Sequence, residues 1–97
     1  MNTEAIKTGM RMAVVDLCNE LDGINKTSDD NEVIQRLFDC LDGSSMIQEI
    51  KNKTGDYADF KVKAYHKNVF EYYDIYYCEE RGFFCYRVIT KEDFNLS

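Results

Sequence analysis

The spacing of hydrophobic residues changes once along the chain, near Gly55. Before this point, apolar residues recur every three or four positions, which is the period of a helix with one buried face. After it, apolar and polar residues alternate, which is the period of a strand with one buried face. The pattern therefore predicts an N-terminal helical part followed by a sheet.

Two helices are predicted with clear ends. The first runs from an N-cap at Thr3 to Gly23, and the second begins with a capping box formed by Asp29 and Glu32 and ends at Gly43. The apolar stripe of the first helix consists of Ile6, Met10, Ala13, Val14, Leu17 and Leu21, and that of the second consists of Val33, Ile34, Leu37, Phe38 and Leu41. Both helices close on Leu-Asp-Gly, so we expect each glycine to adopt the left-handed cap conformation.

A short third helix is predicted between Ser45 and Thr54. Ser45 and Gln48 have the spacing of a second capping box, and Met46, Ile47 and Ile50 follow with apolar side chains. We expect this helix to complete the helical layer.

Three strands are predicted after Gly55: Tyr57–Tyr65, Val69–Tyr77 and Phe83–Thr90. Two-residue turns at Lys67-Asn68 and Arg81-Gly82 would connect them as an antiparallel meander. These turns set three rows on the core face: Phe60 opposite Ile75 and Val88, Val62 opposite Tyr73 and Thr90, and Ala58 opposite Tyr77 and Tyr86. All members of the rows are apolar, aromatic or threonine, and this agreement favours both registers. Glu71, opposite Ala64, is the exception, at the end of the face.

The predicted fold is α+β, a single domain over residues 1–97. Two or three N-terminal helices, at about residues 3–53, would form a layer on one face of the sheet. The sheet, at about residues 57–90, would be a three-stranded antiparallel meander of order 1-2-3. A short polar tail over 91–97 would follow. The predicted core is Ile6, Met10, Val14, Leu17, Ile34, Leu37, Leu41, Ile50, Phe60, Val62, Tyr73, Ile75, Tyr77, Phe84, Tyr86 and Val88.

The net charge of −6 is concentrated in one stretch, Asp16–Asp42. This stretch holds eight carboxylates against Lys26 and Arg36, whereas the rest of the chain is neutral. We call the carboxylates the acidic lobe: Asp16, Glu20, Asp22, Asp29, Asp30, Glu32, Asp39 and Asp42. Such a lobe repels nucleic acid and lipid head groups and attracts a basic protein surface. A solvated surface that only keeps the protein in solution is the simpler interpretation.

Four cysteines and one histidine do not have the spacing of a metal site. The closest pair, Cys78 and Cys85, is seven residues apart, whereas structural zinc sites use C-x₂₋₄-C pairs. The predicted register places these two cysteines opposite each other. Met1–Ala5 lacks the basic start of a secretory signal, so a cytoplasmic protein with reduced thiols is expected. No stretch approaches the roughly 20 apolar residues that span a membrane, and no metal or cofactor is predicted.

The outer face of the predicted sheet mixes aromatic and basic side chains with Asp74. We call four of its residues the aromatic face: Phe70, Tyr72, Tyr76 and Arg87. Cross-strand ion pairs with tyrosines packed over them would explain this pattern structurally. Tyrosine and arginine are also enriched at protein interfaces, and aromatic rings beside cations are typical of single-stranded nucleic-acid binders.

The function predicted from these features is binding to a protein, without catalysis. His66 has no serine nearby in sequence and no cysteine lies in a basic setting, so an enzyme is not predicted. We expect an inhibitor of the phage or mobile-element anti-defence, antitoxin or immunity type. Its carboxylates would stand in for phosphates on the basic surface of a nucleic-acid-handling protein.

Two alternatives remain open. The first is a nucleic-acid binder, either through the lysine- and tyrosine-bearing sheet face or as a winged helix-turn-helix with Val33–Cys40, Leu41–Ser45 and Met46–Lys53 as first helix, turn and reader. The second is a homodimer that covers the exposed aromatic residues of the sheet.

Overall fold

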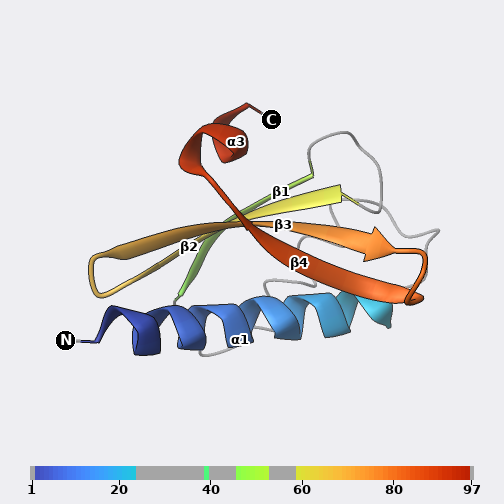
Figure 1. Cartoon of the computed structure of the whole chain (residues 1–97), viewed down its shortest axis with the longest axis horizontal. Helices are drawn as coiled ribbons and strands as arrows, with labels where there is room; N and C mark the ends of the chain where they lie inside the picture. Colours follow the sequence, from blue (N-terminus) through green and yellow to red (C-terminus); the bar gives the residue numbers. More distant parts are fainter. Residues whose placement is uncertain (1, 24–38, 40–45, 53–58, 97) are drawn as a thin grey trace.

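The computed structural model describes residues 2–23, 39, 46–52 and 59–96. A long helix, α1 (Thr3–Asp22), lies along one face of an antiparallel sheet, and a short helix, α3 (Lys91–Asn95), lies on the opposite face (Figure 1). The strands are β1 (Ile47–Asn52), β2 (Asp59–His66), β3 (Val69–Cys78) and β4 (Phe83–Ile89), in the order β1-β2-β3-β4. The predicted α+β class is confirmed, but the sheet has four strands instead of three. The predicted second helix lies outside the described residues, apart from Asp39.

Helix α1 follows the predicted stripe, with two differences at its ends. Its N-cap is Asn2 and not Thr3, because the Asn2 side chain accepts a hydrogen bond from the Glu4 N–H at 3.0 Å. At the C-cap, Gly23 has φ −91° and ψ −6°, so the predicted left-handed cap is wrong there. The Gly23 N–H instead donates to the Glu20 carbonyl at 3.1 Å, which closes the last turn in a right-handed conformation.

The segment predicted as a third helix is strand β1. Residues Ile47–Asn52 pair antiparallel with β2, with Ile50 opposite Val62 and a register irregularity between Ile47 and Glu49. The physical reason is that pairing with β2 supplies backbone hydrogen bonds along the whole segment, and this tertiary gain outweighs a local capping signal. The reader helix of the winged-helix alternative is therefore absent, since Met46–Lys53 was its assigned segment.

The β2–β3 hairpin has the predicted register. Phe60 lies opposite Ile75, and Val62 lies opposite Tyr73. The turn residues Lys67 and Asn68 have φ of 48° and 67°, the left-handed values that a tight two-residue hairpin turn requires.

The β3–β4 register differs from the prediction by two residues. Tyr73 lies opposite Val88, and Cys78 lies opposite Phe83, so the predicted pairing of Cys78 with Cys85 is wrong. The cause is a longer loop, Glu79–Gly82, closed by hydrogen bonds from the Arg81 and Gly82 N–H groups to the Cys78 carbonyl. Because the shift is even, every side chain stays on its predicted face.

The core lies between α1 and the sheet. Of the predicted core, nine residues are buried: Met10, Val14, Leu17, Ile50, Phe60, Val62, Tyr73, Ile75 and Phe84. Ile6, Tyr77 and Tyr86 pack against them and are partly buried. Ile34, Leu37 and Leu41 lie outside the described residues. Val88 is wrong as a core residue, because on the edge strand β4 it is 49% exposed.

The predicted polar tail folds as helix α3. The Thr90 side chain caps it by accepting a hydrogen bond from the Asp93 N–H at 3.1 Å. Phe94 is buried against Tyr72, with ring centroids 5.3 Å apart, and the Lys51 ammonium lies 4.0 Å from the centre of the Phe94 ring. Helix α3 thus covers part of the outer face of the sheet.

Candidate functional site

The predicted acidic lobe is described only in part. Asp16 and Asp22 are exposed on α1, Glu20 lies between them on the same helix, and Asp39 is exposed. The other four residues, Asp29, Asp30, Glu32 and Asp42, lie outside the described residues. The last turn of α1 contains no basic residue. Carboxylates there oppose the negative end of the helix dipole, which costs stability instead of adding to it.

One of these carboxylates has a structural partner. The Asp22 side chain accepts a hydrogen bond from the Phe84 N–H at 2.9 Å. Phe84 lies on the edge strand β4, so this contact satisfies an edge N–H group and joins the end of α1 to the sheet. Asp22 is therefore explained by the fold, whereas the fold does not require a carboxylate at the exposed position of Asp16.

A mostly apolar groove runs between α1 and β4, and the charged residue among its described lining residues is Arg81. Its volume is about 300 Å³, and two of its walls are exposed apolar side chains, Val15 at 41% and Phe83 at 42%. The groove is lined by Val15, Cys18, Asn19, Arg81, Phe83, Phe84, Cys85 and Tyr86. We call it the α1–β4 groove. The sequence analysis missed it, although Met12 and Val15 stand outside the buried stripe of α1 and could have indicated an apolar outer surface.

The four residues of the aromatic face lie on the outer face of the sheet, and each contacts a neighbouring side chain. Tyr72 packs under Phe94, and Phe70 stacks with Tyr65 at 4.6 Å between ring centroids. Tyr76 lies beneath the guanidinium of Arg87, 5.7 Å from its ring centre. This face and α1 lie on opposite sides of the sheet (Figure 1), so the structure does not bring the aromatic face together with the carboxylates of α1.

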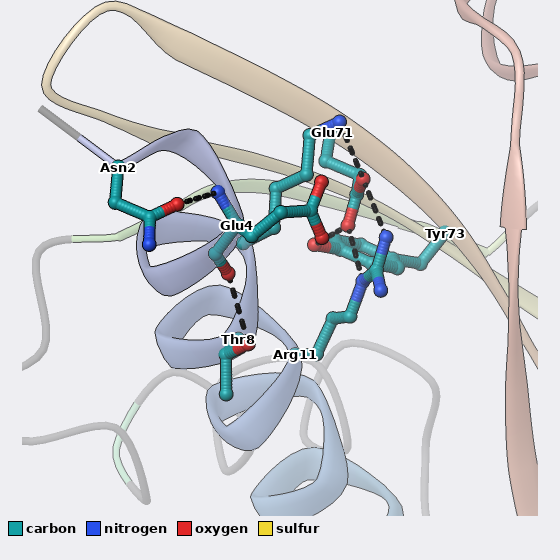
Figure 2. A network of polar contacts seen from close by, with 7 residues as sticks. Asn2, Glu4, Thr8, Arg11, Glu71 and Tyr73 are labelled. Carbon is teal, nitrogen blue, oxygen red and sulfur yellow. Dashed lines mark hydrogen bonds and ion pairs between the residues drawn. The ribbon is translucent and has the colours of Figure 1, made fainter.

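A buried polar network, which the sequence analysis also missed, joins α1 to β3 (Figure 2). Glu71 is 6% exposed and receives two parallel hydrogen bonds from Arg11, at 2.8 Å and 3.0 Å. The Tyr73 hydroxyl donates a third at 2.7 Å, and the Lys7 ammonium lies 3.9 Å from the same carboxylate. Both carboxylate oxygens are therefore satisfied, which makes a charge on the core face of the sheet tolerable.

The network shifts the pKa values of its members. Burial alone would raise the pKa of Glu71, but hydrogen bonds from Arg11 and Tyr73 outweigh it, and the pKa lies below its usual value. The pKa of Tyr73 is raised by burial and by its hydrogen bond to Glu71, and the pKa of Arg11 is raised by the same carboxylate. All three groups are held in one protonation state at neutral pH, as in a structural ion pair.

A second buried carboxylate, Asp74, lies on the outer face in a row of charged residues. Lys61 lies opposite it on β2 and Arg87 opposite it on β4. Arg87 donates to one oxygen only, with Nη2 2.9 Å and Nε 3.1 Å from Asp74 Oδ2. Asp74 Oδ1 is buried and has no hydrogen-bond partner within the described part of the chain.

Two cysteines, Cys18 and Cys85, have raised pKa values. Burial, with smaller contributions from Asp22 and Cys85, raises the pKa of Cys18 to about 12. Burial and the neighbouring Cys78 raise the pKa of Cys85. A raised pKa makes both thiols poor nucleophiles at neutral pH.

Within the described residues, no group of three or more His, Cys, Asp and Glu side chains is arranged to hold a metal ion. The helices in that part of the chain are also too short or too polar to cross a membrane. Comparisons with protein-family models, with curated proteins and with solved structures found no match for this chain.

Proposed function

We propose that this chain is a protein-binding module that inhibits a nucleic-acid-handling protein by covering its basic surface. The observation that carries the proposal is that two exposed carboxylates of α1 neighbour lining residues of the α1–β4 groove: Asp16 follows Val15 in the chain, and Asp22 accepts a hydrogen bond from the Phe84 N–H. Asp16 is exposed next to Val15, which forms a wall of the groove. An apolar centre with a charged rim is the usual composition of a specific protein interface.

The preferred partner surface is therefore basic, with one apolar side chain that enters the groove. Carboxylates would take the places that phosphates occupy when the partner holds nucleic acid, and they would speed the encounter at low salt. The apolar contact with Val15 and Phe83 would supply most of the affinity, because charge pairs at an exposed rim contribute little.

The proposal is tested by capturing proteins from the native cell on wild-type protein and on two double variants. Asp16→Lys/Asp39→Lys reverses two exposed carboxylates of the acidic lobe. Glu49→Lys/Glu92→Lys applies the same charge change elsewhere, on β1 and α3. We expect one basic protein to bind wild type and the control, to be lost from the Asp16/Asp39 variant, and to be displaced by duplex DNA.

Two results would overturn the proposal. The first is capture of the same protein by all three baits, since the acidic lobe would then be irrelevant. The second is a gel shift in which the chain itself binds duplex or single-stranded DNA at low salt.

A further inference from the structure

A cavity of about 570 Å³ opens on the outer face of the sheet, on the opposite side from the α1–β4 groove. It is lined by Lys61, Arg87, Val88, Ile89, Thr90 and Asp93. These residues come from the middle of β2, the end of β4 and the start of α3. A volume of this size is in the range of small-molecule sites.

Lys61 is the unusual member of this lining. It is only 6% exposed, yet none of the described residues forms an ion pair or hydrogen bond with its ammonium. Asp74 lies directly opposite on β3, but the contact at Asp74 is made by Arg87. The Lys61 stem is buried, but its ammonium is not among the buried polar atoms without a partner in the described residues, so it meets the cavity and is accessible to an anion there.

The neighbouring cation, Lys51, is engaged elsewhere. Lys51 lies opposite Lys61 on β1, and its ammonium contacts the Phe94 ring at 4.0 Å and the Phe94 carbonyl at 3.4 Å. Two lysines side by side on adjacent strands repel each other. The Lys51 ammonium is satisfied by Phe94 of α3, whereas Lys61 lines the cavity.

Two further hydrogen-bond donors border the cavity. Arg87 uses Nε and Nη2 on Asp74, which leaves Nη1 without a partner in the described part of the chain, and its side chain is 68% exposed. The Thr90 oxygen accepts from the Asp93 N–H, so its own proton remains to be donated. Lysine, arginine and a hydroxyl are the donor types that bind oxyanions.

We propose that this cavity binds a small molecule through an oxyanion group, a phosphate monoester or a carboxylate. The oxyanion lies between Lys61 and Arg87 and pairs with the Lys61 ammonium. Val88 and Ile89 contact the body of the ligand, and the Asp93 carboxylate accepts a hydrogen bond from a hydroxyl or amine on it. Arg87 is already paired with Asp74, so Lys61 is the lining cation that has no anionic partner among the described residues, and this favours an anionic ligand over a neutral one.

The inference is tested by titrating the protein, labelled with ¹⁵N, at 150 mM salt with four probes. Glucose 6-phosphate and gluconate present hydroxyls with a phosphate or a carboxylate, inorganic phosphate lacks the body, and glucose lacks the charge. We expect at least one anionic sugar to shift the amide signals of Lys61, Arg87 and Thr90 in a saturable way. Glucose is expected to leave them unchanged, and the stronger anion identifies the preferred oxyanion.

Two lysine variants of equal charge provide the control. Lys61→Met removes the ammonium at the cavity, whereas Lys63→Met removes a lysine of the same strand that lies over Phe70, 5.4 Å from its ring centre. We expect Lys61→Met to weaken binding at least tenfold and Lys63→Met to change it less than twofold. A Lys61→Gln variant repeats the measurement with a polar side chain, and dispersed amide spectra establish that each variant is folded.

The inference is overturned if neither anionic sugar binds at 10 mM, or if Lys61→Met and Lys63→Met weaken binding equally. The latter result would mean that the anion responds to net charge and not to the cavity. Neither result bears on the α1–β4 groove, which lies across the sheet, so this test and that of the proposed function can fail separately.

Discussion

Glu71 and Asp74 are two buried carboxylates on the same strand, but they face opposite sides of the sheet and differ in what surrounds them. Glu71 lies on the core face, where Arg11 and Tyr73 satisfy both of its oxygens. Asp74 lies on the outer face, where Arg87 satisfies one oxygen and the other has no partner within the described residues. A complete set of partners indicates a structural role, whereas Asp74 keeps one acceptor oxygen unsatisfied among the described residues.

The difference has a structural cause in what covers each face. Helix α1 extends along the whole core face and presents Arg11 and Lys7 at fixed positions. On the outer face, α3 spans only Lys91–Asn95 and covers Tyr72. It does not cover the row of charged residues formed by Lys61, Asp74 and Arg87, and the two cations of this row line a cavity. The long helix α1 therefore supplies partners for both oxygens of Glu71, whereas the short helix α3 supplies none for Asp74 Oδ1.

The largest expected effect comes from removing the cation on the core face. Arg11→Met leaves Glu71 buried without its main partner, and we expect a loss of about 2–3 kcal/mol in the free energy of unfolding, somewhat below that of a fully buried pair because Arg11 is partly exposed. Urea denaturation measures it. The double variant Arg11→Met/Glu71→Leu should recover most of the loss, since no buried charge remains.

Lys7 is the matched control for this prediction. Its ammonium lies 3.9 Å from Glu71 and adds no hydrogen bond, so Lys7→Met should cost no more than about 1 kcal/mol. If Arg11→Met cost as little as Lys7→Met, the network would not hold α1 on the sheet, and the contrast with Asp74 would lose its basis.

A smaller effect is expected from acid. The pKa of Glu71 is lowered in the folded protein, so its contribution is fully present above the unfolded value of about 4.3 and is lost as the pH falls through the lower, folded value. The loss is smaller than in Arg11→Met, because a protonated Glu71 still accepts a hydrogen bond. Thermal unfolding of wild type and Glu71→Gln between pH 6 and pH 2.5 should give curves that converge toward low pH; parallel curves would contradict the assignment.

The smallest effect is expected on the outer face. Arg87 is 68% exposed, so solvent screens its attraction to Asp74, and Lys61 still lies opposite Asp74 on β2 as a neighbouring cation when Arg87 is removed. Arg87→Met should therefore lower the free energy of unfolding by only about 1 kcal/mol, less than Arg11→Met. Urea denaturation beside Arg11→Met measures the contrast between the two faces directly. A loss as large as that of Arg11→Met would show that the two carboxylates are equivalent and that the outer row is structural.

The candidate surfaces could be predicted from the sequence only as separate pieces. Charge counting identified the carboxylates of the acidic lobe, and alternation placed Tyr72 and Arg87 on the outer face, as the structure has them. The α1–β4 groove and the cavity at Lys61 could not be predicted. The groove and the cavity each form between elements that are distant in the chain, and no local sequence pattern shows how far apart those elements lie in the folded protein.

The sequence by itself determined the elements whose signals are local. The spacing of apolar residues set α1. The left-handed turn at Lys67-Asn68 set the β2–β3 register, because a two-residue turn permits only one pairing of the two strands that it joins. The alternation of residues along β3 also placed Tyr73 and Ile75 on the core side of the sheet and Tyr72 and Tyr76 on the outer side.

Only the tertiary structure decided what depends on distant partners. Residues Ile47–Asn52 became β1 through hydrogen bonds with β2, a gain that no local propensity contains. The longer Glu79–Gly82 loop shifted the register of β4 by two residues. An even shift keeps every side chain on the same face of the sheet, so the alternation of apolar and polar residues could not distinguish the two registers. The burial of Glu71 depended on Arg11, sixty positions earlier in the chain. These choices are set by packing and by the pairing of charges, both of which require the folded chain.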